Sequence, residues 1–368
     1  MTKRQQFIDY VKNGGERFCS PQIGCGAGFD SKMTGHEWVS ETPFEDTLAC
    51  DEMFDMVPLL NIGMPDAGMC NPELAFQTLS FEPGDTRRKS TYGLKTPVGS
   101  VERSFVEDIR VGTVPVKFAI EDEDDLDVFD WYLDGALEVD TTPITNFLRH
   151  VSDNVVGDRA ALSLQWGAQP YELLGWPSTV DTMFLANDCP EKFTALMDKI
   201  LRWDIRLLDC CQKAGVDFVF LGTPAAEMIS PSYYERFIVP YSQMFSAEAH
   251  KRGVLIYSHV CSPVEPMLTM GYYNQMGIDL FETLSMAPVG NVASLADALT
   301  KLDPSICTRG NVGLDVLLTQ GVDAVKEHCY TALRESEGRK HILAASDYLF
   351  YDIPKENVEA MCAAMREY

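Results

Sequence analysis

The stretch VDFVFL, residues 216–221, is a continuous apolar run in the second half of the chain, and VLIYSH (254–259) and IDLFETL (278–284) repeat the pattern. Runs of this length are typical of strands that are buried on both faces, as in a parallel sheet. A helical pattern separates each run from the next. The alternation therefore predicts right-handed βαβ units.

The same alternation extends outward from these runs, from residue 161 to the C-terminus. Proline, Ser-Pro and glycine residues mark where the helices begin and end. We predict six strands, at residues 161–165, 216–221, 254–259, 279–284, 305–310 and 341–346. We predict helices at residues 190–213, 232–251, 263–276, 292–302, 321–335 and from 354 onward.

Two more strands would close the sheet into a (β/α)8 TIM barrel, an α/β fold, and residues 18–23 and 56–61 are the candidates. Residues 90–120 are extended and rich in Thr and Val, which favours a hairpin insertion. The expected organisation is one barrel domain over 1–368, with an irregular N-terminal part over 1–155 and regular βα units over 156–368.

The charge balance is strongly acidic, with 30 Lys and Arg against 55 Asp and Glu and a formal net charge of −25. This balance argues against nucleic acid or an anionic membrane surface as a partner. The acidic run at 121–127 is interpreted as the solvated start of a helix. With 46% hydrophobic residues, the chain is too apolar to be a disordered acidic segment.

Cysteine content and the N-terminal residues indicate the compartment. The start, MTKRQQFIDYVKNGG, lacks the apolar segment of a signal peptide, and no apolar run approaches the ~18 residues of a membrane span. Eleven cysteines, an odd number, are too few for a disulfide scaffold in a chain of this length. We expect a cytoplasmic protein whose reduced thiols are available as metal ligands or nucleophiles.

His259 and Cys261 are two residues apart at the end of a predicted strand, so both side chains point to the same face. Glu282 ends the next strand and would lie beside them at the catalytic end of a barrel. Zinc accepts such a mixture of N, S and O ligands, and three protein ligands leave one position open for catalysis. The alternative is structural: a buried thiol acting as a small hydrophobic group, and a glutamate paired with a basic side chain.

Other polar residues follow the predicted strands more loosely. Glu227 could act as an acid or base, or only cap a loop. Gln165, Trp166 and Tyr171 could line the substrate pocket, and Asn311 could bind substrate or a turn. The glycine-rich residues 24–28 lack the spacing of a dinucleotide-binding loop and are expected to form a tight loop at the barrel mouth.

The second half of the chain resembles the uroporphyrinogen decarboxylase superfamily, which includes zinc- and corrinoid-dependent methyltransferases. The matching pieces, in order, are AGVDFVFLG (214–222), ISPSYYERFIVPY (229–241), RGVLIYSHVC (252–261), MGIDLFETL (276–284), RGNVGLDVLL (309–318) and DIPKENVEAM (352–361). The tetrapyrrole decarboxylases carry an arginine-bearing N-terminal motif for the substrate's carboxylates. This chain has SPQIGCGAGFD (20–30) and no arginine between Arg17 and Arg87, which argues against porphyrin decarboxylation.

The methyltransferase branch carries H-x-C on one strand, a glutamate on the next and a cysteine at the end of the last strand. The resemblance implies that His259, Cys261 and Glu282 are metal ligands. At the fourth position, Ser346 stands where a cysteine is expected, with Asp347 beside it. Ser346, an oxygen of Asp347, or water would then complete the site. Cys307 is a weaker substitute because it lies deeper in its strand.

The resemblance implies Zn²⁺ and a corrinoid carried by a separate protein. Loss of a thiolate ligand leaves zinc more electrophilic. This favours demethylation of a small donor that carries a methoxy or methylamine-like group. The methyl group would then be transferred to the corrinoid protein. Glu227 and Asp347 are the candidate catalytic residues. The alternatives are methyl transfer from the corrinoid to a thiol or pterin, and a non-catalytic ligand-binding barrel or a decarboxylase-like lyase. A homodimer formed through the N-terminal insertion is also possible.

Overall fold

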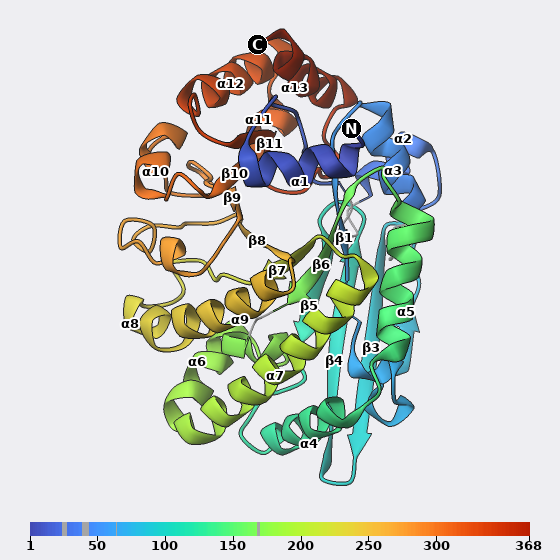
Figure 1. Cartoon of the computed structure of the whole chain (residues 1–368). Helices are drawn as coiled ribbons and strands as arrows, with labels where there is room; N and C mark the ends of the chain where they lie inside the picture. Colours follow the sequence, from blue (N-terminus) through green and yellow to red (C-terminus); the bar gives the residue numbers. More distant parts are fainter. Residues whose placement is uncertain (24–27, 39–43, 64, 168–169) are drawn as a thin grey trace.

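The structure is a computed structural model that describes residues 1–23, 28–38, 44–63, 65–167 and 170–368. Its core is a curled parallel sheet of seven strands surrounded by helices (Figure 1). The strands follow one another around the sheet in chain order: β1 (Leu59–Ile62), β6 (Ala161–Gly167), β7 (Phe218–Leu221), β8 (Leu255–Val260), β9 (Leu280–Thr283), β10 (Cys307–Val312) and β11 (His341–Ala345).

A short extended segment at residues 18–20 joins the two edges of this sheet. On one side, Ser20 N–H donates to the Leu343 carbonyl (2.8 Å), and Leu343 N–H donates to the Phe18 carbonyl (3.2 Å). On the other side, Val57 N–H donates to the Cys19 carbonyl (3.4 Å) just before β1. The predicted segment 56–61 thus corresponds to β1 at one edge of the sheet, and the start of the predicted segment 18–23 fills the gap between the edges. The TIM-barrel prediction is confirmed.

Helices cover the outside of the barrel at most of the crossings from one strand to the next. The helices are α1 (Lys3–Asn13), α2 (Phe29–Thr34), α3 (Phe44–Met53), α4 (Asp125–Glu138), α5 (Thr142–His150), α6 (Thr179–Asp188), α7 (Pro190–Ala214), α8 (Pro231–Tyr233), α9 (Val239–Lys251), α10 (Leu295–Lys301), α11 (Leu314–Thr319), α12 (Val322–Glu335) and α13 (Lys355–Glu367). Short helical turns are η1 (Ala67–Met69), η2 (Pro72–Leu74), η3 (Val151–Val156), η4 (Pro170–Gly175), η5 (Tyr234–Ile238) and η6 (Tyr273–Gln275).

The helix predicted over 263–276 is wrong. That stretch consists of turns and the single turn η6. Pro266 cannot donate a backbone hydrogen bond, and Gly271 takes a positive φ of 72° that ends any helical turn. Apolar periodicity alone did not reveal these breaks.

The N-terminal helix α1 closes the end of the barrel at which the strands begin. Phe7, Tyr10 and Val11 are buried against side chains from the interior of the barrel. Arg4 forms an ion pair with Asp217, just before β7 (2.9 Å between Nε and Oδ2), and Lys340, just before β11, donates to the Val11 carbonyl (2.7 Å). Since this end is plugged, the opposite end, where the strands finish, is the open one.

Residues 77–117, around the predicted hairpin, form a four-stranded antiparallel sheet beside the barrel (Figure 1). Its strands are β2 (Gln77–Glu82), β3 (Arg87–Thr96), β4 (Gly99–Asp108) and β5 (Gly112–Lys117). Leu94 and Val101 bury one face in the main core. Among the described helices, none has both the length and the apolar character needed to cross a bilayer.

Candidate metal centre

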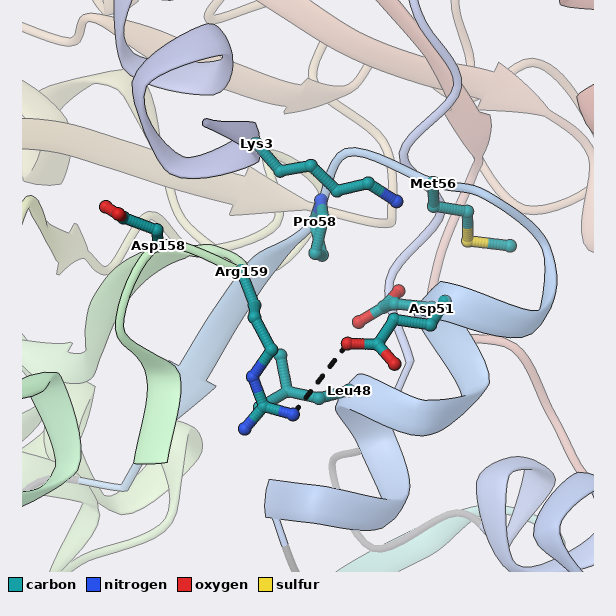
Figure 2. A pocket seen from close by; sticks show the side chains of 8 residues that line it. Lys3, Leu48, Asp51, Met56, Pro58, Asp158 and Arg159 are labelled. Carbon is teal, nitrogen blue, oxygen red and sulfur yellow. Dashed lines mark ion pairs between the residues drawn. The ribbon is translucent and has the colours of Figure 1, made fainter. Parts of the chain in front are cut away.

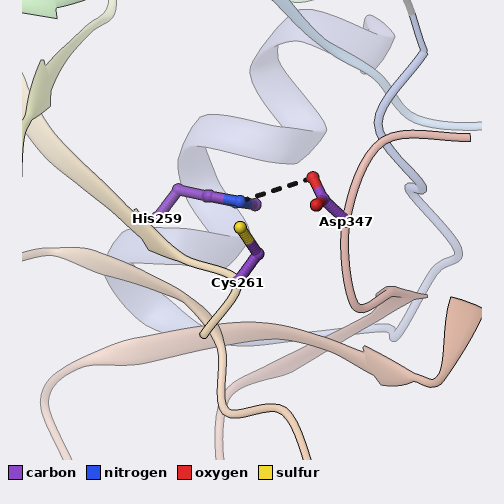
Figure 3. A group of neighbouring side chains, drawn as sticks. All are labelled: His259, Cys261 and Asp347. Carbon is purple, nitrogen blue, oxygen red and sulfur yellow. Dashed lines mark ion pairs between the residues drawn. The ribbon is translucent and has the colours of Figure 1, made fainter. Parts of the chain in front are cut away.

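Three side chains with metal-binding atoms meet at the open end of the barrel. His259 lies near the end of β8, Cys261 directly follows β8, and Asp347 follows β11. The ligand atoms of His259, Cys261 and Asp347 all lie within 4.8 Å of one another (Figure 3). The two strand ends lie far apart in sequence, so only closure of the barrel brings Asp347 to the other two residues.

His259 lies between two carboxylates. Its Nδ1 atom is 3.0 Å from Oε2 of Glu282, and its Nε2 atom is 3.5 Å from Oδ1 of Asp347. Burial alone would lower the pKa of His259, but Tyr257, Asp347, Cys261 and Glu282 together raise it well above its ordinary value. The pKa of Asp347 is lowered despite its burial, because it accepts a hydrogen bond from His259. The two carboxylates therefore stabilise positive charge on the imidazole, and a metal ion bound at Nε2 would take the place of that proton.

Glu282, expected as a metal ligand, lies behind the His259 ring and outside the group of converging ligand atoms. It is almost fully buried, at 1% exposure. Its Oε1 atom is 2.7 Å from Arg309 Nη1, and Oε2 accepts a hydrogen bond from Gln22 Nε2 (2.5 Å). Held by these two residues, Glu282 contacts His259 Nδ1 and orients the imidazole ring. A carboxylate in this position is common behind metal-bound histidines.

Ser346 also lies outside the converging group. Its hydroxyl oxygen accepts a hydrogen bond from the backbone N–H of Leu314 (3.2 Å), the first residue of α11. Its own N–H donates to the Val312 carbonyl at the end of β10 (2.8 Å). Through these contacts Ser346 links the end of β11 to the end of β10 and the start of α11. The next residue, Asp347, provides the ligand atom.

Of the expected pocket residues, Gln165 lies near the cluster. Gln165 Nε2 donates to the Tyr348 hydroxyl (2.7 Å), and the Tyr348 ring centroid is 5.9 Å from that of His259. Trp166 lies in β6, but its side chain is outside the described part of the structure. Tyr171 is buried in η4, where its carbonyl accepts a hydrogen bond from Tyr233 (3.0 Å).

The other expected residues have structural surroundings. Asn311, in β10, donates its side-chain N–H to the Leu284 carbonyl (3.0 Å) and so ties two strands together. Glu227 is exposed in the loop after β7. Cys307 is buried at the first position of β10, the far end from the cluster. Of the glycine-rich loop, residues 24–27 lie outside the described residues.

Three functional candidates escaped the sequence analysis. Arg309 is an arginine inside an apolar strand, and Gln22 follows the segment that closes the barrel; both contact Glu282. Glu172 lies in η4, after the end of β6, and burial raises its pKa to about 7. A carboxyl group with such a pKa is suited to proton transfer. A charged residue within an otherwise apolar strand was the available signal for Arg309.

Two cavities lined by described residues lie at the other end of the barrel. One, with a volume of about 270 Å³, is bounded by α1, α3 and the segments that lead into β1 and β6 (Figure 2). A second, of about 560 Å³, lies between α1 and α13. Because chemistry in TIM barrels takes place where the strands end, neither cavity is the candidate active site.

Comparisons with known proteins agree with this architecture. Residues 176–368 match the family described as "Uroporphyrinogen decarboxylase (URO-D)". The uroporphyrinogen decarboxylase of Geotalea daltonii is 25% identical over 185 residues, and that of Geobacter metallireducens is 23% identical over 185 residues. Each alignment covers 50% of this chain and 50% of the relative, so the chain matches about half the length of these curated relatives.

A solved structure with the same fold is a methyltransferase from Methanosarcina mazei. It superimposes with a TM-score of 0.68 at 15% sequence identity, over 100% of this chain and 99% of that chain. At this level of identity the likeness concerns the fold.

Proposed function

This chain belongs to the uroporphyrinogen decarboxylase family, and we propose that it is a zinc-dependent methyltransferase that passes a methyl group from a small methylated donor to a corrinoid protein. The observation that carries the proposal is the cluster of His259, Cys261 and Asp347 at the open end of the barrel. The full-length fold match to a methyltransferase supports it.

The residues present fit a zinc ion. The cluster offers one imidazole nitrogen, one thiol sulfur and one carboxylate oxygen, a set that zinc accepts. Three protein ligands leave a further position for a substrate atom, as in catalytic zinc sites. Behind the first ligand, Glu282 accepts from His259 Nδ1, which directs Nε2 toward the centre of the cluster.

Bound zinc would supply Lewis acidity toward the heteroatom that carries the methyl group. The protein's own residues do the rest. His259 and Cys261 hold one side of the site from β8, and Asp347 holds the other from β11. Gln165 and Tyr348 form a hydrogen-bonded pair beside the His259 ring, where they can contact a small donor.

The identity of the third ligand favours the donor-side reaction. A carboxylate at Asp347 donates less electron density than a thiolate, so the ion stays more electrophilic. That suits activation of an ether, amine or sulfide more than activation of an acceptor thiol. Porphyrin decarboxylation is not favoured, because the sequence has no arginine between Arg17 and Arg87.

Metal content is the first test. Protein purified without chelators should contain about one zinc per chain, and His259→Ala, Cys261→Ser or Asp347→Ala should remove it. Cys70→Ser is the matched control, since this partly buried thiol lies outside the cluster. A folded wild-type protein that binds no zinc would contradict the proposal and favour a non-catalytic barrel.

Methyl transfer is the second test. Cob(I)alamin is mixed with wild-type protein and a panel of methyl ethers, methylamines and methyl sulfides, and methylcobalamin formation is followed by absorbance. We expect formation with at least one class, and none with Cys261→Ser. Demethylation of methylcobalamin by an added thiol or pterin, without the forward reaction, would assign the acceptor-side function instead.

A further inference from the structure

Arg309 is among the largest fully buried side chains of the protein, at 1% exposure. A buried guanidinium needs a charged partner and further hydrogen bonds. Its Nη1 atom lies 2.7 Å from Oε1 of Glu282, and its Nε donates to the Ser20 carbonyl (2.6 Å). The arginine thus connects the segment that closes the barrel to the residue behind the metal cluster.

The barrel's own register builds this row of residues. His259 of β8 pairs with Glu282 of β9, and Glu282 pairs with Arg309 of β10. In parallel strands, residues paired in this way point to the same side of the sheet. All three side chains therefore meet inside the barrel without any loop to position them.

Glu282 is saturated with hydrogen-bond donors. Oε1 faces Arg309, and Oε2 lies within reach of Gln22 (2.5 Å), His259 Nδ1 (3.0 Å) and the Tyr257 hydroxyl (3.3 Å). A carboxylate held by four donors loses most of these contacts if it turns toward a metal ion. Its contact with Nδ1 also leaves Nε2 of His259 as the ligand atom.

We propose that Arg309 is a positioning residue that holds Glu282 behind His259, withholds it from the metal, and leaves Asp347 as the carboxylate ligand. This inference rests on the metal centre of the proposed function. Arg309 acts only through Glu282 and touches neither the cluster of ligand atoms nor the open position.

The test compares metal binding in Arg309→Met with that in the wild-type protein. Zinc affinity is measured by competition with a chromophoric chelator, and coordination by the visible spectrum of the Co²⁺-substituted protein. We expect Arg309→Met to bind zinc about 10- to 100-fold more weakly, the usual effect of a lost residue behind a metal ligand. We also expect the Co²⁺ d–d bands to change, because the freed Glu282 or a turned His259 alters the ligand set.

Controls separate positioning from simple loss of stability. Arg4→Met breaks a partly buried arginine–aspartate pair at the plugged end of the barrel and should leave zinc affinity and the Co²⁺ spectrum unchanged. Arg309→Lys, which keeps the charge but not the fork of donors, should recover part of the affinity. If Arg309→Met does not fold, Arg309→Lys becomes the test variant, and it should bind zinc more weakly than the wild-type protein because a single ammonium group cannot replace the fork of donors that holds Glu282.

The outcomes are distinct. Wild-type affinity and an unchanged Co²⁺ spectrum in folded Arg309→Met would overturn the role of Arg309 and leave the metal centre standing. The same result in Arg309→Lys would do so if Arg309→Met does not fold. A wild-type protein that binds neither zinc nor cobalt would overturn the proposed function, and this inference with it.

Discussion

His259 and Asp347 face each other across the mouth of the barrel, with Nε2 of the histidine 3.5 Å from Oδ1 of the aspartate. One residue comes from β8 and the other follows β11, so neither strand alone determines the distance. Cys261 completes the cluster from the same strand end as His259. Each property of the proposed metal centre depends on this juxtaposition.

Replacing Asp347 by cysteine should change the character of the centre. Asp347→Cys gives the site two thiolates in place of one, so we expect tighter zinc binding and a slower donor-side reaction, because the ion becomes less electrophilic. In the Co²⁺-substituted protein, the thiolate-to-cobalt charge-transfer absorbance should increase to about twice that of the wild type. An unchanged charge-transfer band would show that residue 347 does not reach the metal.

Helix α1 should contribute strongly to stability without affecting the metal centre. The ring of Phe7 is fully buried, and its centroid lies 5.7 Å from the ring centroid of Phe18 and 5.7 Å from that of Phe218. Phe7→Ala should therefore lower the free energy of unfolding by about 3–5 kcal/mol, measured by urea denaturation. Phe184→Ala, at a side chain that is 62% exposed, is the matched control and should change it by less than about 0.5 kcal/mol. Zinc content should stay the same in both variants.

His341 should make the protein less stable in mild acid. Burial lowers its pKa to about 3, against an ordinary value of 6.5. Between these values only the unfolded chain takes up the proton, so stability falls as the pH falls below 6.5. At pH 5 this residue should cost about 2 kcal/mol relative to pH 7.

The comparison that isolates this effect uses His341→Gln. The wild-type free energy of unfolding should lose about 2 kcal/mol more than that of the variant between pH 7 and pH 5. Equal losses in the two proteins would assign the acid sensitivity to other groups.

Glu172 should have the opposite pH dependence. Burial raises its pKa from 4.5 to about 7, so its contribution to stability is present below about pH 4.5 and is lost as the pH rises through 7. Glu172→Gln should be more stable than the wild type at pH 8, by about 3 kcal/mol, and nearly equally stable at pH 4.5. Thermal unfolding at the two pH values measures this, and a constant difference would contradict it.

Much of the architecture follows from local pattern. Buried parallel strands are continuous apolar runs, and the runs at 216–221 and 254–259 correspond to β7 and β8 within two residues. The helix predicted over 190–213 is α7. The failure at 263–276 has a local cause too, since Pro266 and Gly271 interrupt a stretch whose apolar spacing is helical.

In the candidate site, too, some features follow from the local sequence and others depend on the tertiary structure. The sequence by itself determined that His259 and Cys261 share one face of a strand, because residues two apart in a strand point the same way. Only the tertiary structure decided which carboxylate faces them. Barrel closure brings Asp347 to the cluster, while the β8–β9–β10 register turns Glu282 toward Arg309 and away from the centre. Contacts between strands distant in sequence arise from the packing of the whole barrel, and no local pattern encodes them.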